Sequence, residues 1–166
     1  IRLRFGGDDP KRRKSVEQAQ RDKIRFLEEK FAPLWGSKGA VAEAFGLAYA
    51  DARDRDKAIE WYRIAVHADD GSASFKAAEE LGNQLARRGE SRDDPVEALR
   101  DIEEAIARLD KLVEIQPTAE REALLGSAYK RLVMIEGRAD GSHQRARGDG
   151  AAGERLEALR AMALHY

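Results

Sequence analysis

Apolar residues recur three or four positions apart through most of the chain, and polar or glycine-rich stretches interrupt them at intervals. This spacing predicts amphipathic helices, because residues three or four apart lie on one face of a helix. The first such segment runs from Lys11 to Phe31, after an Asp9-Pro10 pair that suits a helix start, and a break is expected at Pro33. Residues 1–38 are therefore expected to form an N-terminal lead-in, extended over residues 1–7, and a packing helix.

Small and large apolar side chains alternate along the next segment as two antiparallel helices would require. Gly46 allows a close approach of the helices, and Tyr49 fills the space beside it. Ala58 and Ala65 let the second helix lie tight against the first. We expect these helices over residues 40–52 and 56–67, before an acidic turn.

The same arrangement recurs downstream. Leu81, Gly82 and Leu85 repeat the first-helix pattern, and a loop is expected at residues 87–91 with Gly89 as the helix stop. Asp94-Pro95 is a capping acid followed by proline, and it predicts a helix over residues 95–115. This second pair carries an insertion of 11 residues, which is expected mostly to extend its second helix at the N-terminal end.

The C-terminal third carries one more copy of the first-helix pattern, within a helix expected over residues 119–135. Residues 137–153 are rich in Gly, Arg and Asp and are expected to form a mobile loop. Simple disorder is favoured there over a regulated element that a partner orders. A last helix is expected over residues 154–166, which makes about seven helices in all.

Composition supports an all-helical protein and narrows its function. The chain has 166 residues, of which 42% are hydrophobic and 37% charged, enough for one domain with a core. Its net charge of -1 gives no global field that would favour nucleic acid or an anionic membrane. Cysteine is absent, which excludes disulfides and thiolate metal sites and fits a reducing cytoplasm. No apolar run approaches the roughly 20 residues that a membrane span needs.

A family resemblance rests on a few short motifs: Phe45-Gly46-x-x-Tyr49, Leu81-Gly82-x-x-Leu85, Leu125-Gly126-x-x-Tyr129 and Ala58-x3-Tyr62-x2-Ala65. These motifs resemble tetratricopeptide repeats (TPRs), which are helix–turn–helix units of about 34 residues. The resemblance covers residues 39–166 and implies an α-solenoid of antiparallel helix pairs in a right-handed superhelix. Residues 124–131 are also similar to TPR-like tails of large bacterial multidomain proteins, so we expect the chain to be a fragment of such a protein.

In the TPR family the first helices line a concave groove that grips a peptide. The resemblance implies a groove here lined by Ala40, Glu43, Leu47, Asp51, Lys76, Glu79, Asn83, Arg87, Glu120, Ser127, Lys130 and Arg131. Asn83, Arg87 and Lys130 suit a peptide carboxylate held by charge-assisted hydrogen bonds. Glu43 and Leu47 stand where the chaperone-tail clamp of the family has basic and Asn residues. A mixed-charge peptide or a folded partner is therefore expected.

Other chemistry finds less support in the sequence. The basic run at residues 11–14 is diluted by acids that follow it, so a solvated helix start is favoured over a nucleic-acid patch. Trp35, Trp61 and Tyr62 could form an aromatic docking site, but core packing is favoured. The three histidines lack ligand spacing, and neither a metal, a cofactor nor a catalytic constellation is expected.

These observations predict a non-catalytic, cytoplasmic scaffold or regulatory module that binds a protein or peptide. Neither nucleic acid nor a membrane is expected as a partner. The alternative is a structural domain that self-associates or docks within a larger signalling protein.

Overall fold

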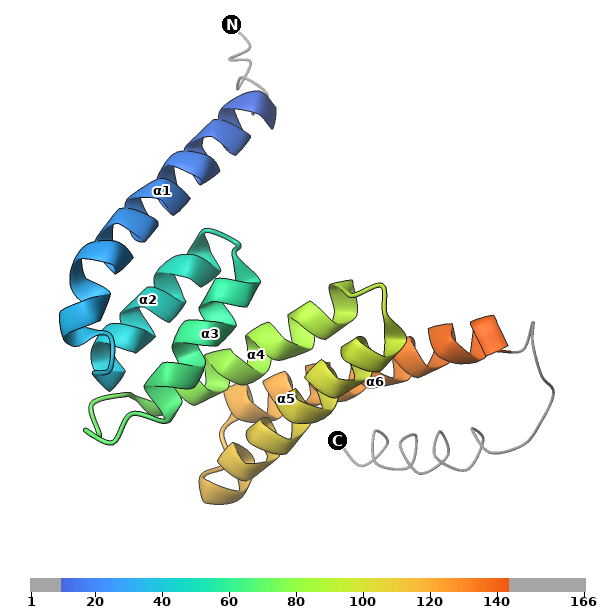
Figure 1. Ribbon diagram of the computed structural model, residues 1–166. Helices are drawn as coiled ribbons and strands as arrows, with labels where there is room; N and C mark the ends of the chain where they lie inside the picture. The colour runs from blue at the N-terminus through green and yellow to red at the C-terminus, as the bar shows by residue number, and fades with distance from the viewer. Residues whose placement is uncertain (1–9, 144–166) are drawn as a thin grey trace, which may run out of the picture. The chain divides into compact units, whose positions relative to one another are not determined.

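Six α-helices follow one another along the computed structural model, which describes residues 10–143 (Figure 1). Their bounds are α1 Pro10–Trp35, α2 Gly39–Asp51, α3 Arg55–Val66, α4 Phe75–Ser91, α5 Pro95–Ile115 and α6 Ala119–His143. No strand occurs in this range, so the predicted all-α class is confirmed. The lead-in predicted at 1–7 and the helix predicted at 154–166 lie outside the described residues.

The chain divides between Ala73 and Ser74 into two compact units. The first unit contains α1, α2 and α3, and the second contains α4, α5 and α6. Each unit begins its repeat pattern with a hairpin of consecutive helices that pack along each other, α2 with α3 in the first unit and α4 with α5 in the second. The predicted TPR-like helix pairs are therefore present in both units.

In the first unit, the α2–α3 hairpin is closed by the small residues that predicted it. A Cβ built on Gly46 would lie 2.7 Å from Cδ1 of Tyr62, so only glycine lets α2 approach that ring. Tyr62, Ala58 and Ala65 are almost fully buried. Asp54 caps α3 by accepting a hydrogen bond from the backbone N–H of Lys57, at 3.3 Å.

The two aromatic residues of α3 belong to this core. Trp61 is 5% exposed, and its ring centroid lies 4.7 Å from that of Phe45 on α2. Tyr62 is buried against Gly46. Trp35 is half exposed, but the other two rings are occupied by packing and do not form the aromatic docking site that the sequence left open.

The helix before this hairpin continues past the predicted break. Pro33 lies inside α1, which ends only at Trp35. Proline removes the hydrogen bond of its own nitrogen to the carbonyl four residues earlier. Because Pro33 stands in the last turn, little helix remains beyond it to be disturbed, and the prediction of a break at this position is wrong.

In the second unit, the α4–α5 hairpin repeats the close approach. A Cβ on Gly82 would lie 2.8 Å from Cγ of Leu109, which is completely buried. The inserted residues lengthen both helices and leave the turn as short as in the first hairpin. α5 begins at Pro95, ten residues before Ala105, whereas α3 begins three residues before Ala58. The expected extension at the start of the second helix is confirmed.

The loop predicted at residues 87–91 is helical instead. α4 continues to Ser91, and Gly89 is buried inside it. A Cβ at Gly89 would lie 2.7 Å from Cγ1 of Ile102 and 2.8 Å from the carbonyl oxygen of Ala98. Gly89 is therefore required by the contact with α5 and not by a helix stop, a distinction that the local sequence could not make.

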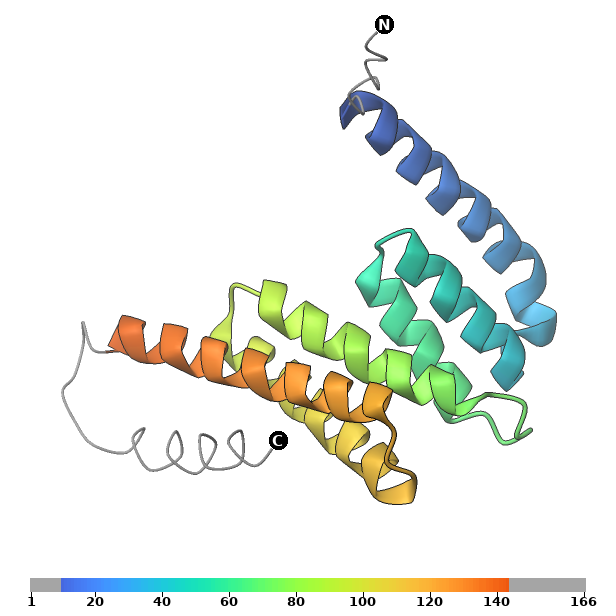
Figure 2. The same ribbon diagram turned by 180° about the vertical axis from the view of Figure 1, so that it is seen from behind.

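The last described helix packs against both members of this hairpin, as Figure 2 shows. α6 continues to His143, so the prediction of a loop is wrong for residues 137–143, and residues 144–153 lie outside the described residues. Gly126 stands at the position of Gly46 and Gly82, yet a Cβ there would meet nothing within 4 Å among the described residues. The described chain contains no helix after α6 to receive it.

A buried carboxylate fastens the end of α4 to α5. Asp101 accepts hydrogen bonds from Nε and Nη2 of Arg88, both at 2.7 Å, and from Nε of Arg92 at 2.8 Å. Burial raises the pKa of the Asp101 carboxyl, but the hydrogen bonds and charges of the two arginines outweigh it and leave the pKa below its ordinary value.

The lowered pKa of Asp101 makes this contact sensitive to acid. The carboxylate binds its proton less tightly in the folded chain than in the unfolded one, so its contribution exists above pH about 4 and disappears as the pH falls through the folded-state pKa. We expect Asp101→Asn to lower the free energy of unfolding by about 2 kcal/mol at pH 7. Urea titrations at pH 7 and pH 3 should show this deficit shrinking in acid; an equal deficit at both would contradict the assignment.

Candidate partner-binding site

One face of α4 carries most of the predicted groove residues of the second unit. Lys76, Glu79, Asn83 and Arg87 lie three or four residues apart and so share one side of the helix. Neighbouring members interact in two places: Nζ of Lys76 forms an ion pair with Glu79 at 3.6 Å, and Nε of Arg87 donates to Oδ1 of Asn83 at 3.2 Å. Nδ2 of Asn83 also donates to Glu80, beside the row, at 3.2 Å. The result is a continuous polar row along the helix.

The α4 row faces α6, and three ion pairs connect the two helices. Lys76 donates to Glu120 at the first turn of α6. Nε of Arg121 donates to Glu79 at 2.7 Å, and Nε of Arg131 donates to Glu90 at 2.8 Å. These contacts hold the first helices of two successive pairs side by side. We call this surface the α4–α6 face.

The three ion pairs differ in how deeply they are buried, and this difference shows which of them stabilise the fold. The side chains of Arg121 and Glu79 are 6% and 10% exposed, so both are committed to the fold. Nη1 of Arg121 also donates to the carbonyl oxygens of Gln116 and Leu112, which fixes the turn between α5 and α6. The predicted groove residue Glu79 therefore supports the α4–α6 face from beneath.

The exposed pair at the start of the face stays ionised at neutral pH. The hydrogen bond with Glu120 raises the pKa of Lys76 in spite of partial burial, and the charges of neighbouring glutamates add to it. The hydrogen bond from Lys76 in turn lowers the pKa of the Glu120 carboxyl. Both groups are open to solvent, so their attraction sets the local charge pattern more than the stability.

Asn83 and Arg87 are the last two residues of the α4 row, and along α4 they lie between Glu79 and Glu90, which both pair with α6. Arg87 is exposed, and because its Nε donates to Asn83, its other four N–H donors are those of the two Nη groups. Asn83 is half-buried and orients Arg87. A planar guanidinium held in this way suits a carboxylate, because it offers two parallel N–H donors.

The structure does not bring all the predicted residues together. Arg131 donates to Glu90 and to the backbone and hydroxyl of Ser127, so these two predicted residues are joined within α6. Lys130 is exposed and, being next to Arg131 in a helix, points about 100° away from it. Glu43 and Leu47 lie on α2 in the first unit; Leu47 is 54% exposed and Glu43 is half-buried.

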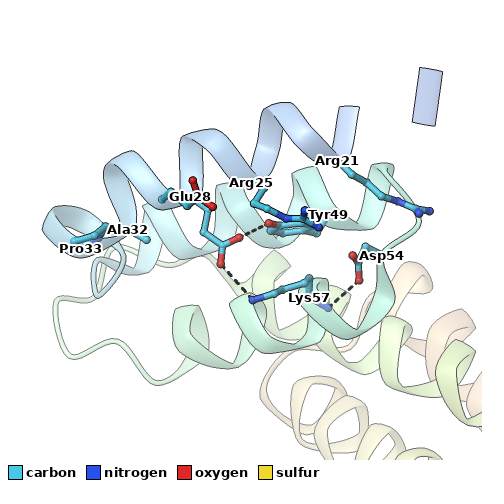
Figure 3. Close-up of a pocket in the computed structure, with 9 residues that line it drawn as sticks. Arg21, Arg25, Glu28, Ala32, Pro33, Tyr49, Asp54 and Lys57 are labelled. Carbon is cyan, nitrogen blue, oxygen red and sulfur yellow. Dashed lines mark hydrogen bonds and ion pairs between the residues drawn. The ribbon is translucent and has the colours of Figure 1, made fainter. Parts of the chain in front are cut away.

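A pocket that the sequence did not predict lies in the first unit, where α1 meets the α2–α3 hairpin (Figure 3). It has a volume of about 460 Å³ and is lined by Arg21, Arg25, Glu28, Glu29, Ala32, Pro33, Tyr49, Asp54 and Lys57. Glu28 accepts hydrogen bonds from the Tyr49 hydroxyl and from Nζ of Lys57, the latter at 3.3 Å. Nε of Arg21 donates to the carbonyl oxygen of Ala52 at 3.2 Å.

These contacts make the pocket a packing joint for α1. Burial, together with the hydrogen bond to Glu28 and its charge, raises the pKa of Tyr49 far above its ordinary value, so the phenol remains a hydrogen-bond donor. Charges of both signs line the pocket in equal number. The sequence held no signal for this joint, because Glu28 and Tyr49 are 21 residues apart and Glu28 lies before the first repeat.

The part of the chain that the structure describes contains neither a candidate metal site nor a helix that could span a membrane. Residues 10–143 contain no group of three or more His, Asp or Glu side chains arranged to hold a metal ion. Among the same residues, every helix is either too short or too polar to cross a membrane.

Comparison with known proteins identifies the repeat region. A family model described as "Tetratricopeptide Repeats-Sensor" matches residues 54–166, which is more than half of the chain. The matched part includes α3 and all of α4, α5 and α6, and therefore the whole α4–α6 face. No curated protein and no solved structure matches the chain.

Proposed function

The chain belongs to the Tetratricopeptide Repeats-Sensor family, and on that premise we propose that it is a non-catalytic protein-interaction module of a larger cytoplasmic protein. Repeat families of this kind typically bind other proteins and do not catalyse reactions. The cysteine-free composition agrees with a cytoplasmic location. The partner we propose is a peptide segment or a folded protein that presents carboxylates to the α4–α6 face.

This proposal rests on one observation about the α4–α6 face: its buried charges hold the helices together, whereas an exposed arginine is left to meet a partner. Buried Arg121 and Glu79 hold α4 and α6 together, so the face is preorganised and costs little ordering on binding. Arg87 is exposed between the Glu79 and Glu90 ion pairs and is oriented by Asn83. A partner carboxylate at Arg87 would form charge-assisted hydrogen bonds without disturbing any contact that the fold needs.

The proposal predicts the effect of reversing two charges. We expect Arg87→Glu with Lys130→Glu to weaken binding of a fluorescein-labelled acidic peptide of mixed Asp, Glu and Gly by about tenfold or more. The reason is the loss of the oriented guanidinium of Arg87 on α4 and of the exposed cation of Lys130 on α6. Fluorescence anisotropy at low salt measures the affinity, and circular dichroism checks that helicity is retained.

The matched control is Arg100→Glu with Lys111→Glu. Both residues are exposed on α5, so this variant makes the same change of net charge away from the α4–α6 face. It should reduce binding only slightly, through the long-range field. If both double variants weaken binding equally, the change in net charge alone explains the effect. If the first variant binds the peptide as the parent does, Arg87 and Lys130 do not belong to the site.

A further inference from the structure

The outer side of α1 exposes large apolar side chains that no helix among the described residues covers. Phe26 is 60% exposed, Leu27 37%, Phe31 40% and Leu34 74%. Four such residues within nine positions form a patch of the kind that marks an interaction site on a folded protein. We call this patch, together with the two lysines described below, the α1 outer face.

The α1 outer face lies opposite the side of the helix that packs in the first unit. Figure 3 shows Arg21, Arg25 and Glu28 directed from α1 towards the hairpin. At about 100° per residue, Leu27 and Leu34 project roughly to the other side of the helix axis. A partner bound to the α1 outer face would therefore leave the contacts of α1 with α2 and α3 intact.

Two lysines stand in the middle of the apolar patch. At 100° per residue, Lys23 and Lys30 fall between Phe26 on one side and Leu27 with Phe31 on the other. Both are exposed, and neither forms an ion pair with another described residue. The Nζ of Lys30 lies 5.4 Å from the ring centroid of Phe31, which keeps the cation at the patch.

The spacing of the face indicates what shape of partner fits it. Lys23 and Lys30 are seven residues apart, and so are Leu27 and Leu34. A seven-residue repeat of two neighbouring rows is the seam by which one helix packs along another. Along that seam the lysines would face the partner about every 10 Å.

From these observations we propose that the α1 outer face binds an amphipathic helix of another protein, with apolar residues along its seam and acidic residues seven apart opposite Lys23 and Lys30. Carboxylates there would neutralise the lysines as apolar residues around them lose water. The proposal concerns a different unit from the α4–α6 face and residues that precede the family match, so it goes beyond the proposed function.

The same features argue against two other occupants. A second copy of α1 in the same seam would set lysine against lysine, and like charges across a helix interface are destabilising. A membrane would take the apolar residues, but lysines in the centre of the patch would then point into the hydrocarbon instead of lying at its margins. Both occupants are outcomes of the test below.

The probe is a 21-residue synthetic helix of three heptads, with leucine along one row and glutamate at the positions that oppose the lysines. Its matched control has lysine in place of those glutamates and is otherwise identical. We expect the full chain to bind the glutamate peptide at least about tenfold more tightly than the lysine peptide. Lys23→Glu with Lys30→Glu should reverse that preference. The double variant makes the charge at both positions negative and leaves the apolar residues of the seam in place.

Two further variants make the result specific. Leu34→Asp should abolish binding of the glutamate peptide without changing helicity, since Leu34 is exposed and supports no packing in the first unit. Arg87→Glu with Lys130→Glu should leave this binding unchanged, which separates the α1 outer face from the α4–α6 face.

Several results would overturn the proposal. They are failure to bind the glutamate peptide, equal binding of both peptides, or no reversal in the double lysine variant. Light scattering that shows a dimer which Leu34→Asp dissociates would assign the face to a second copy of the chain. Sedimentation with phosphatidylserine vesicles that depends on Leu34, in the absence of peptide binding, would assign it to a membrane.

Discussion

Gly46→Leu should unfold the first hairpin, lowering the free energy of unfolding by about 3 kcal/mol or more. The first added carbon already falls 2.7 Å from the Tyr62 ring, and that ring is 1% exposed and cannot move aside. Relief would require α2 and α3 to separate, which would also uncover Ala58 and Ala65. Thermal unfolding followed by circular dichroism should show the transition of this variant more than about 10 °C lower.

Ala44→Leu provides the matched control on the same helix. Ala44 is exposed, so the same added bulk meets solvent instead of the buried ring. Leucine and alanine are both good helix formers, so we expect the free energy of unfolding of this variant to lie within about 0.5 kcal/mol of that of the parent. If Gly46→Leu melts like the parent, the pairing of α2 with α3 through Tyr62 is wrong.

Arg121→Met should be the most damaging change of charge in the second unit. It removes the hydrogen bond to Glu79 and those to the carbonyl oxygens of Leu112 and Gln116. Glu79, which is 7% exposed in the parent, would lose the guanidinium and keep only the longer ion pair with Nζ of Lys76, at 3.6 Å. Because a buried charge without its partner is strongly unfavourable, the expected loss is about 3–5 kcal/mol at neutral pH, measured by urea unfolding.

Two comparisons identify the cause of that loss. Glu79→Leu combined with Arg121→Met should recover part of it, because the double change leaves no unpaired charge. Arg131→Met makes the same substitution on the same helix in the more exposed pair with Glu90, and should cost no more than about 1 kcal/mol. Additive losses in the double variant would show that the arginine acts through its carbonyl contacts and not through Glu79.

Local signals in the sequence were sufficient where a helix end depends on its own neighbours. α5 begins at Pro95 and ends at Ile115 as predicted, since Asp94 caps its start and Pro117 follows its end. Gly46 and Gly82 were likewise understood as places of close helix approach, because a glycine between large apolar residues has that meaning in a repeat.

Similar local signals failed where a distant residue decided the outcome. Gly89 has the sequence context of a helix stop, but Ile102 and Ala98 of the next helix occupy the space beside it. The glycines in residues 137–143 predicted a loop, yet α6 continues to His143. A glycine lowers helix propensity by only about 1 kcal/mol, which tertiary context readily overrides.

In the candidate site, too, the sequence predicted some features, and others depended on distant residues. Its position on α4 and α6 followed from the resemblance to TPRs, since the repeat defines which side of the first helices faces outward. The roles within it did not follow: Glu79 and Arg121 are 42 residues apart and are buried together, whereas Arg87 remains exposed. Nothing in the spacing of single residues distinguishes a buried ion pair from a solvated one.

By itself, the sequence determined that this protein is helical, where its helices pair, and to which repeat family it belongs, because these properties depend on periodicity and on small residues at fixed offsets. Only the tertiary structure decided which charges support the fold and which remain available, and only it revealed the joint between α1 and the hairpin. The physical reason is that burial and pairing depend on neighbours that folding brings from tens of residues away.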